Sequence, residues 1–181
     1  MEEIFFIDEV KVGHKVENFK TQALLPNGEF KEVSLEDNMK EGKWTVVFFW
    51  PLDFTFVCPT EIKAMSEMYE DFKKANAEVF GVSTDSIYSH LAWTKQELGK
   101  INFPMLQDTN HDISAQFGVL NEEEGIAIRG AFIIDPEGIL QSAMINNLNV
   151  GRNTDEILRL LEAFQCGGLC PVNWHKGEDT L

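Results

Sequence analysis

One continuous apolar run constrains the fold more than any other feature of this sequence. Residues 44–50 read Trp-Thr-Val-Val-Phe-Phe-Trp, a run of aromatic and β-branched side chains that Pro51 ends. A strand with one face in solvent would alternate apolar and polar residues, so this run predicts a strand that is covered on both faces. We therefore expect a central sheet with helices packed against its faces.

Helical and extended patterns alternate along the rest of the chain. Helices are predicted at 59–75, 86–98 and 154–164, and strands at 78–83, near 103–106, at 130–134 and at 139–145. The last two strands are joined by Asp-Pro-Glu-Gly at 135–138, a strong signal for a tight turn. A strand–helix–strand order early in the chain and a hairpin late in it predict an α/β fold with a mixed central sheet.

The two ends of the chain differ from this pattern. The first 40 residues read as strands and loops, with a turn signal at 25–28, and the last 15 residues, from Gly167, are polar and without periodicity. We expect one domain of ordinary size over 1–165, with an N-terminal strand and loop extension, followed by a mobile C-terminal tail over 166–181.

Composition and charge exclude several classes of partner. Fifteen Lys and Arg against thirty Asp and Glu give a formal charge of −15, which repels phosphate and argues against nucleic acid and anionic membranes. The acidic start at residues 1–4 lacks the basic region of a secretory signal, and no apolar stretch is long enough to span a bilayer. Three cysteines are too few for a disulfide scaffold, so we expect a cytoplasmic protein.

Cys58 is the residue with the clearest chemical potential. It follows the apolar strand and a short loop, and the next residue, Pro59, suits the first position of a helix. Cys58 is thus expected at or next to the helix N-cap, where free N–H groups and the helix dipole favour a negatively charged sulfur. The hydroxyl of Thr55 could reach that sulfur or its reaction partner if the loop curls. From position alone, a buried structural cysteine is an equally good interpretation.

Other chemistries of cysteine find less support. Pro59 to Glu61 follow Cys58, so the sequence lacks the Cys-x-x-Cys pair of a thioredoxin-type disulfide exchanger. A Cys–His protease site stays open in principle, but no histidine has an adjacent carboxylate in a suitable position. Each histidine is more simply a surface or core residue; they are His14, His90, His111 and His175.

A metal or cofactor is not expected either. Cys166, Cys170 and His175 provide three potential zinc ligands in the tail, whereas a closed structural zinc site takes four. The sequence contains no Gly-rich phosphate loop and no dinucleotide-binding fingerprint. We therefore predict a protein without a metal ion and without a bound cofactor, whose use of a nicotinamide or flavin would belong to a separate reductase.

The segment around Cys58 resembles the active site of a known family. Pro51, Thr55 and Cys58 form the pattern Pro-x-x-x-Thr-x-x-Cys, which resembles the peroxiredoxin motif. The longer string FFWPLDFTFVCPTEI is similar to the typical 2-Cys group, which includes the peroxidase subunit of alkyl hydroperoxide reductase (AhpC). Further similar segments are 129–136, with the active-site arginine, 150–153, with a second arginine, and 169–177, with the resolving cysteine.

The resemblance implies a thioredoxin-like fold and a peroxidase reaction. The Cys58 thiolate would attack hydrogen peroxide or an organic hydroperoxide and become a sulfenic acid. Arg129 would stabilise the negative charge of the Cys58 thiolate and the charge that moves to the departing oxygen. Thr55 would bind the peroxide. Pro51 would shield the site from water. Glu61 and Arg152 would be the two supporting residues, and Glu61 would hold Arg129 or Arg152 rather than react itself.

The resemblance also implies a second cysteine. It assigns the resolving role to Cys170, which would form an intersubunit disulfide with Cys58. Cys166 departs from the simplest family pattern, and it could be a packed core thiol, an alternate resolving thiol or a relay in thiol–disulfide exchange. The implied partners are thioredoxin or a flavoprotein disulfide reductase as electron donor, and copies of the same chain in a homodimer that assembles into a decamer.

Sensitivity to excess peroxide is a separate expectation. Relatives that are easily overoxidised carry a Gly-Gly-Leu-Gly segment where this chain has residues 96–100, and a C-terminal Tyr-Phe helix beyond the position of Leu181. We expect a robust enzyme, because the helix start would unwind easily and release Cys58. Two other functions stay open: a redox-gated chaperone or peroxide sensor that uses the same cysteines, and a thioredoxin-like binding module with an inert Cys58.

Overall fold

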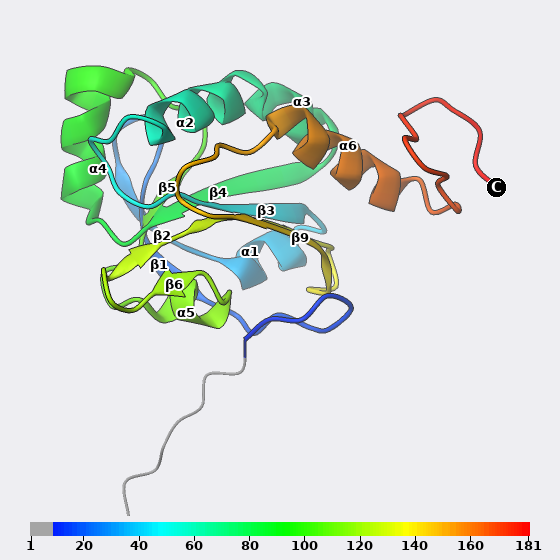
Figure 1. Ribbon diagram of the computed structural model, residues 1–181, viewed down its shortest axis with the longest axis horizontal. Helices are drawn as coiled ribbons and strands as arrows, with labels where there is room; N and C mark the ends of the chain where they lie inside the picture. The colour runs from blue at the N-terminus through cyan, green and yellow to red at the C-terminus, as the bar shows by residue number, and fades with distance from the viewer. Residues whose placement is uncertain (1–8) are drawn as a thin grey trace, which may run out of the picture.

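Within residues 9–181, which the computed structural model describes, a seven-stranded mixed sheet forms the centre of the protein (Figure 1). Its strands are β1 (Lys20–Leu24), β2 (Phe30–Ser34), β3 (Trp44–Phe49), β4 (Ala77–Ser83), β5 (Met105–Gln107), β8 (Arg129–Ile134) and β9 (Leu140–Asn146). They lie in the order β2-β1-β5-β4-β3-β8-β9. Strand β3 pairs in parallel with β4 and antiparallel with β8, so the predicted mixed sheet is confirmed. The short strands β6 (Leu120–Asn121) and β7 (Ile126–Ala127) pair with each other.

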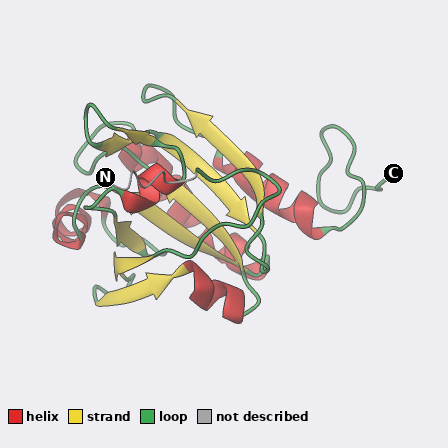
Figure 2. Cartoon of the chain, turned by 90° about the horizontal axis from the view of Figure 1, so that it is seen from below, coloured by secondary structure: helices red, strands yellow, loops and turns green. Residues whose placement is uncertain are grey.

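Helices cover both faces of the sheet (Figures 1 and 2). They are α1 (Leu35–Lys40), α2 (Cys58–Glu67), α3 (Tyr69–Lys74), α4 (Ile87–Trp93), the π-helix η1 (Thr94–Leu98), α5 (Asp112–Gln116) and α6 (Thr154–Gln165). Side chains of α2, α3 and α6 join one buried apolar cluster, and side chains of α1 and α5 join another. The two clusters lie on opposite faces of the same sheet.

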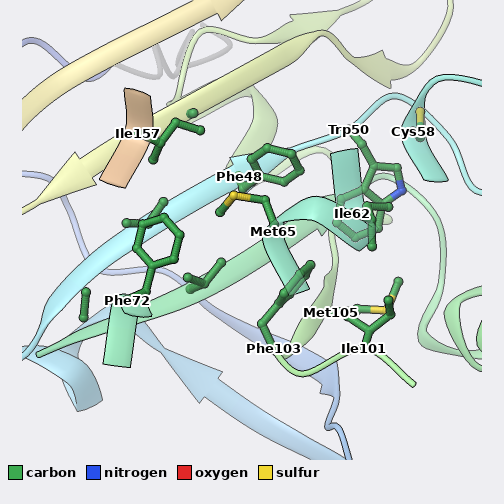
Figure 3. Close-up of a cluster of buried hydrophobic side chains, with 14 of the residues drawn as sticks. Phe48, Trp50, Cys58, Ile62, Met65, Phe72, Ile101, Phe103, Met105 and Ile157 are labelled. Atoms are coloured by element: carbon green, nitrogen blue, oxygen red, sulfur yellow. The ribbon is translucent and has the colours of Figure 1, made fainter. Parts of the chain in front are cut away.

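Strand β3 shows why residues 44–50 had to be apolar throughout. Val46, Phe48 and Trp50 belong to the cluster under α2, whereas Val47 and Phe49 belong to the opposite cluster. All five side chains are fully buried. Successive side chains of a strand point to opposite faces, so a strand between two helical layers needs an apolar residue at every position. Figure 3 shows the first of these clusters, with Phe48, Trp50 and Cys58 among its members.

Two predicted helices are interrupted. The helix expected over 59–75 is two helices, α2 and α3, that meet at Met68, whose ψ of −3° departs from helical geometry. The break lies beside Ser66, whose backbone oxygen accepts a hydrogen bond of 3.0 Å from the side chain of Asn102. The helix expected over 86–98 changes at Thr94 from α4 to the π-helix η1. The hydrogen bond at Ser66 comes from a residue distant in the chain, so the periodicity of the helix did not indicate the first break.

Both predicted turns form. The Gly28 N–H donates to the Leu25 carbonyl at 2.9 Å, and the Gly138 N–H donates to the Asp135 carbonyl at 3.0 Å. Gly28 and Gly138 each have a φ of +86°, which side chains with a Cβ rarely adopt. The start of the chain at residues 1–4, on which the expected absence of a secretory signal rested, lies outside the described residues.

The segment after α6 is irregular, as expected, but it is attached to the helix. Residues 166–181 form loops and turns that extend beyond the end of α6 (Figures 1 and 2). Trp174 is 3% exposed, its Nε1 donates to the Glu178 carbonyl at 3.0 Å, and Arg159 of α6 donates to the Trp174 carbonyl at 2.8 Å. The expectation of a simply polar tail therefore overlooked a buried tryptophan that anchors it.

Across residues 9–181, the longest apolar helical stretch falls short of the length needed to cross a membrane.

Candidate active site

The sulfur of Cys58 is buried at the start of a helix. Cys58 is the first residue of α2, Val57 is its N-cap, and Pro59 occupies the second position. The helix thus begins one residue earlier than Pro59, and Cys58 lies next to the N-cap as expected. Val57 makes no side-chain capping bond, Pro59 has no N–H, and the Thr60 N–H donates to the Val57 carbonyl at 3.0 Å. Cys58 therefore lies at the positive end of the helix dipole. Cys58 is 1% exposed.

A buried guanidinium faces this sulfur. Arg129 is the first residue of β8, and its Nη1 donates to Cys58 Sγ at 3.5 Å. The same side chain is 4% exposed, and its Nε donates to the Leu148 carbonyl at 2.7 Å, which fixes its orientation. A permanent positive charge at this distance in a water-poor site can stabilise negative charge that develops on the sulfur or on a group that reacts with it. The surroundings of Cys58 are therefore not those of an ordinary structural cysteine.

Glu61 joins two arginines one turn into α2. Its Oε2 accepts hydrogen bonds from Arg129 Nη1 at 2.6 Å and from Arg152 Nη2 at 3.1 Å. Its Oε1 accepts from the backbone N–H of Arg152 at 2.6 Å and from Arg152 Nε at 2.9 Å. Burial raises the pKa of Glu61, but the hydrogen bonds and charges of Arg152 and Arg129 outweigh it and hold this pKa below its usual range. Glu61, expected to hold one of the arginines, holds both.

Arg152 is fixed on all sides. Its guanidinium carbon lies 3.6 Å from the centre of the Phe48 ring, and its Nη1 donates to the Gly130 carbonyl. Burial lowers the pKa of Arg152, and the Glu61 carboxylate opposes that shift. Because a single carboxylate balances only one of two guanidinium groups, the cluster of Glu61, Arg129 and Arg152 keeps one excess positive charge. A thiolate at Cys58 would balance it.

Pro51 and Thr55 lie in the loop between β3 and α2. Pro51 is buried, and it ends the strand as predicted. The Thr55 hydroxyl donates to the Leu52 carbonyl at 2.9 Å, and among the described residues it forms no hydrogen bond with Cys58. The expectation that Thr55 reaches the sulfur itself is thus not met in this conformation. Its oxygen keeps lone pairs that can accept a further hydrogen bond.

The same loop contains Asp53, the centre of a buried polar network that the sequence analysis did not predict. Asp53 Oδ2 lies 2.7 Å from His90 Nδ1 and accepts from Ser89 Oγ at 2.8 Å, while Asp53 Oδ1 accepts from Trp50 Nε1 at 2.9 Å. His90 is fully buried, so its interpretation as a core histidine agrees with the structure. The search for a carboxylate adjacent to each histidine did not reveal the partner of His90, because Asp53 lies 37 residues away in the chain.

Strand topology contains the signal that would have revealed this network. Asp53 follows β3 and Asp85 follows β4, and these parallel neighbours end at the same edge of the sheet. The backbone N–H of Asp53 donates to Asp85 Oδ2 at 2.9 Å. Burial and the negative charge of Asp53 raise the pKa of Asp85. The network connects the loop that carries Pro51 and Thr55 to the ends of two strands.

Cys166 and Cys170 lie together in the tail. Their sulfur atoms are 3.0 Å apart, and Cys166 is exposed, which contradicts the interpretation of Cys166 as a packed core thiol. The hydrogen bond with Cys166 and burial raise the pKa of Cys170. Helix α6 carries this tail away from the end of the sheet where α2 begins (Figure 1), so the structure does not bring Cys58 and Cys170 of one chain together.

His175 does not complete a metal site with Cys166 and Cys170 within residues 9–181. The His175 N–H donates to Glu178 Oε2 at 2.7 Å. In the described part of the chain, no group of three or more His, Cys, Asp and Glu side chains is arranged to hold a metal ion.

Comparison with known proteins identifies the family. The AhpC/TSA family matches residues 12–143, more than half of the chain. Peroxiredoxin prdx-2 of Caenorhabditis elegans is 53% identical over 179 residues, which cover 94% of this chain and 88% of that protein.

Solved structures agree with this match. The reduced 2-Cys peroxiredoxin of Plasmodium vivax superposes with a TM-score of 0.90 at 39% identity, over 93% of this chain and 91% of that one. Enterococcus faecalis AhpC superposes with a TM-score of 0.84 at 43% identity, over 90% of this chain and 99% of that one. The predicted thioredoxin-like fold is thereby confirmed. The chain belongs to the AhpC/TSA family and is a peroxiredoxin, an enzyme of the thiol peroxidase class.

Proposed function

We propose that this peroxiredoxin reduces hydrogen peroxide and organic hydroperoxides with Cys58 as its peroxidatic cysteine. The observation that carries the proposal is the 3.5 Å contact between Arg129 Nη1 and Cys58 Sγ at the first turn of α2. The thiolate attacks one peroxide oxygen and the O–O bond breaks. The other oxygen leaves as hydroxide or alkoxide and takes up a proton, and Cys58 becomes a sulfenic acid.

Arg129 has two roles in this proposal. It stabilises the thiolate before the reaction, and it stabilises the charge that moves to the departing oxygen during it. Glu61 and Arg152 are positioning residues, since neither has a hydrogen bond to the sulfur among the described contacts and both hold Arg129 in place directly or through one another.

The loop residues would bind and shield the peroxide. The proton of the Thr55 hydroxyl is committed to the Leu52 carbonyl, so its free lone pairs are suited to accept a hydrogen bond from the O–H of a peroxide. Pro51, buried beside the end of β3, keeps water from one side of the site and offers no N–H of its own. The hydrogen bonds of Asp53 with Trp50 and His90 hold this loop against the end of β3 and against α4.

Cys170 of the partner subunit would resolve the sulfenic acid. A disulfide requires Cβ atoms about 4 Å apart, and the tail of the same chain points away from the start of α2 (Figure 1). A tail that extends from the body suits a crossing to a second copy, and we propose a homodimer that assembles further to a decamer. Cys58 is 1% exposed, so the first turn of α2 must unwind before the disulfide forms.

The electron donor would be thioredoxin or a flavoprotein disulfide reductase, and the protein would act in the cytoplasm. An assay that follows peroxide consumption with each candidate donor in turn identifies the donor. No bound cofactor is required, because the electrons come from thiols throughout: two thiols become one disulfide for each peroxide reduced.

Single-turnover oxidation tests the proposal. Reduced protein is mixed with one equivalent of hydrogen peroxide, quenched within the first turnover and run on a non-reducing gel. We expect a disulfide-linked dimer that is absent in Cys58→Ser and in Cys170→Ser, with Cys166→Ser as the matched control that still forms it. Unchanged peroxide consumption in Cys58→Ser would contradict the proposal, and persistence of the early dimer in Cys170→Ser would assign the resolving role to Cys166.

A further inference from the structure

A sharp reversal of the chain after α6 brings two cysteines together. Cys166 is the C-cap of α6, and Gly167 follows with a φ of +70°, a conformation that favours glycine and that commonly ends helices. The chain then turns back on the helix, and Cys170 Sγ donates to the Ala163 carbonyl at 3.5 Å. The sulfur atoms of Cys166 and Cys170 are left 3.0 Å apart.

We infer that Cys166 is a third catalytic thiol, which takes over the disulfide from Cys58 and forms an intrachain disulfide with Cys170. This inference rests on the proposed function, since the disulfide between Cys58 and Cys170 must form first. A disulfide bond is about 2.05 Å long, so the two tail sulfurs need to approach by only a small further movement.

The exchange step needs no additional oxidant. The Cys166 thiol loses its proton to water, and the resulting thiolate attacks the Cys170 sulfur of the intersubunit disulfide. A bond between Cys166 and Cys170 forms while the bond between Cys170 and Cys58 breaks, and Cys58 departs with the electron pair as a thiolate. One disulfide is lost and one is gained, so the number of oxidised sulfur atoms does not change.

The surroundings of the leaving sulfur favour this direction. Cys58 is released as a thiolate, and in the closed site Arg129 donates a hydrogen bond to its sulfur, which stabilises the product of the exchange. The helix start can then close again over a side chain that is 1% exposed in the structure. The oxidising equivalents remain in a tail where Cys166 is exposed, so a protein reductant can reach them without opening the active site.

A time course of disulfide mapping tests this inference. Reduced protein receives one equivalent of hydrogen peroxide and is quenched with acid and an alkylating reagent at times from milliseconds to minutes. Trypsin releases residues 160–176 as one peptide, so an intrachain bond between Cys166 and Cys170 appears as the loss of two hydrogens within it. In the native chain we expect the cross-linked dimer to form first and then to disappear as this intrachain disulfide accumulates.

Three variants make the outcome specific. In Cys166→Ser the cross-linked dimer should form at the native rate and persist. The control Asp179→Ser changes an exposed residue of the tail, and in this variant the dimer should disappear as in the native chain. In Cys58→Ser the intrachain disulfide should not form on this time scale, which excludes direct oxidation of the tail. A cross-linked dimer that persists equally in the native chain and in Cys166→Ser would overturn the inference while leaving the proposed function intact. Failure of Cys58 to consume peroxide would overturn both.

Discussion

Arg152 binds both carboxylate oxygens of Glu61, with Nε at 2.9 Å from Oε1 and Nη2 at 3.1 Å from Oε2. This pair is buried, and it is electrically neutral by itself. Arg129, which also contacts Glu61, therefore contributes a positive charge that no other described side chain in the cluster balances. The nearest group that can carry the compensating charge is the sulfur of Cys58.

Replacing Glu61 tests this charge balance, because the free energy of unfolding depends on whether the two buried arginines have a carboxylate partner. Glu61→Gln leaves two buried guanidinium groups without a carboxylate, and we expect a loss of about 3 kcal/mol in the free energy of unfolding at pH 7, in line with other broken buried pairs. The pKa of Glu61 is held below its ordinary value in the folded state, so its contribution is fully present above the pKa of the unfolded chain and is lost as the pH falls through the lower, folded value.

Thermal unfolding measured from pH 7 down to acid checks that sign. The difference in melting temperature between the native protein and Glu61→Gln should be largest near neutrality and should shrink in acid, below the ordinary range of a glutamate. A difference that stays constant over the whole pH range would show that charge is not the cause.

Glu78 should show the opposite dependence on pH. Burial raises the pKa of Glu78, whose Oε1 accepts hydrogen bonds from Tyr69 at 2.8 Å and from the Val79 N–H at 3.0 Å. Stability should therefore decrease as the pH rises from the unfolded pKa through the higher folded one. Glu78→Gln keeps the acceptor without the charge, so we expect a higher melting temperature at pH 7 and no difference in acid. An equal change in the exposed control Glu70→Gln would argue against burial as the reason.

The network around Asp53 should contribute to stability far more than a surface ion pair does. Asp53→Ala removes the partner of Trp50, Ser89 and His90 together, and we expect a loss of about 3 kcal/mol in urea unfolding. The exposed pair of Asp71 with Lys74 provides the comparison, and Asp71→Ala should cost less than about 1 kcal/mol. Similar losses in the two variants would mean that the buried network does not fix the loop.

Thr55 should affect the reaction with peroxide and not the fold. Thr55→Val removes the hydroxyl, and the loss of one hydrogen bond to the reacting peroxide should lower kcat/KM about 10- to 100-fold. Thr55→Ser keeps the hydroxyl and should retain most of the activity. Melting temperatures measured beside the kinetics show whether the loop stays folded, and equal kinetics for Thr55→Val and Thr55→Ser would remove Thr55 from the site.

The sequence predicted those parts of the fold that depend on local pattern. The apolar run at 44–50 predicted a strand between two layers, and its side chains alternate between the two apolar clusters. Pro59 placed the start of the helix to within one residue, since prolines restrict the backbone locally. The break at Met68 was not predictable, because it accompanies a hydrogen bond from Asn102, which is distant in the chain.

The same distinction holds for the site. The contact of Arg129 with Cys58 joins residues 71 positions apart, and only the family resemblance indicated it. The contact of Asp53 with His90 belongs to no motif and was missed. The proximity of Cys166 and Cys170 depends on a reversal at Gly167 that a spacing of four residues does not specify.

The rate at which peroxide oxidises Cys58 in an Arg129→Met variant tests the central claim most directly. Glu61 keeps its pair with Arg152 in this variant, so the fold should persist, which a melting curve verifies. Stopped-flow mixing with hydrogen peroxide should show a second-order rate constant at least about 100-fold below that of the native protein, because the sulfur and the departing oxygen both lose their stabilising charge. A rate constant close to the native value, in a protein that is still folded, would contradict the account.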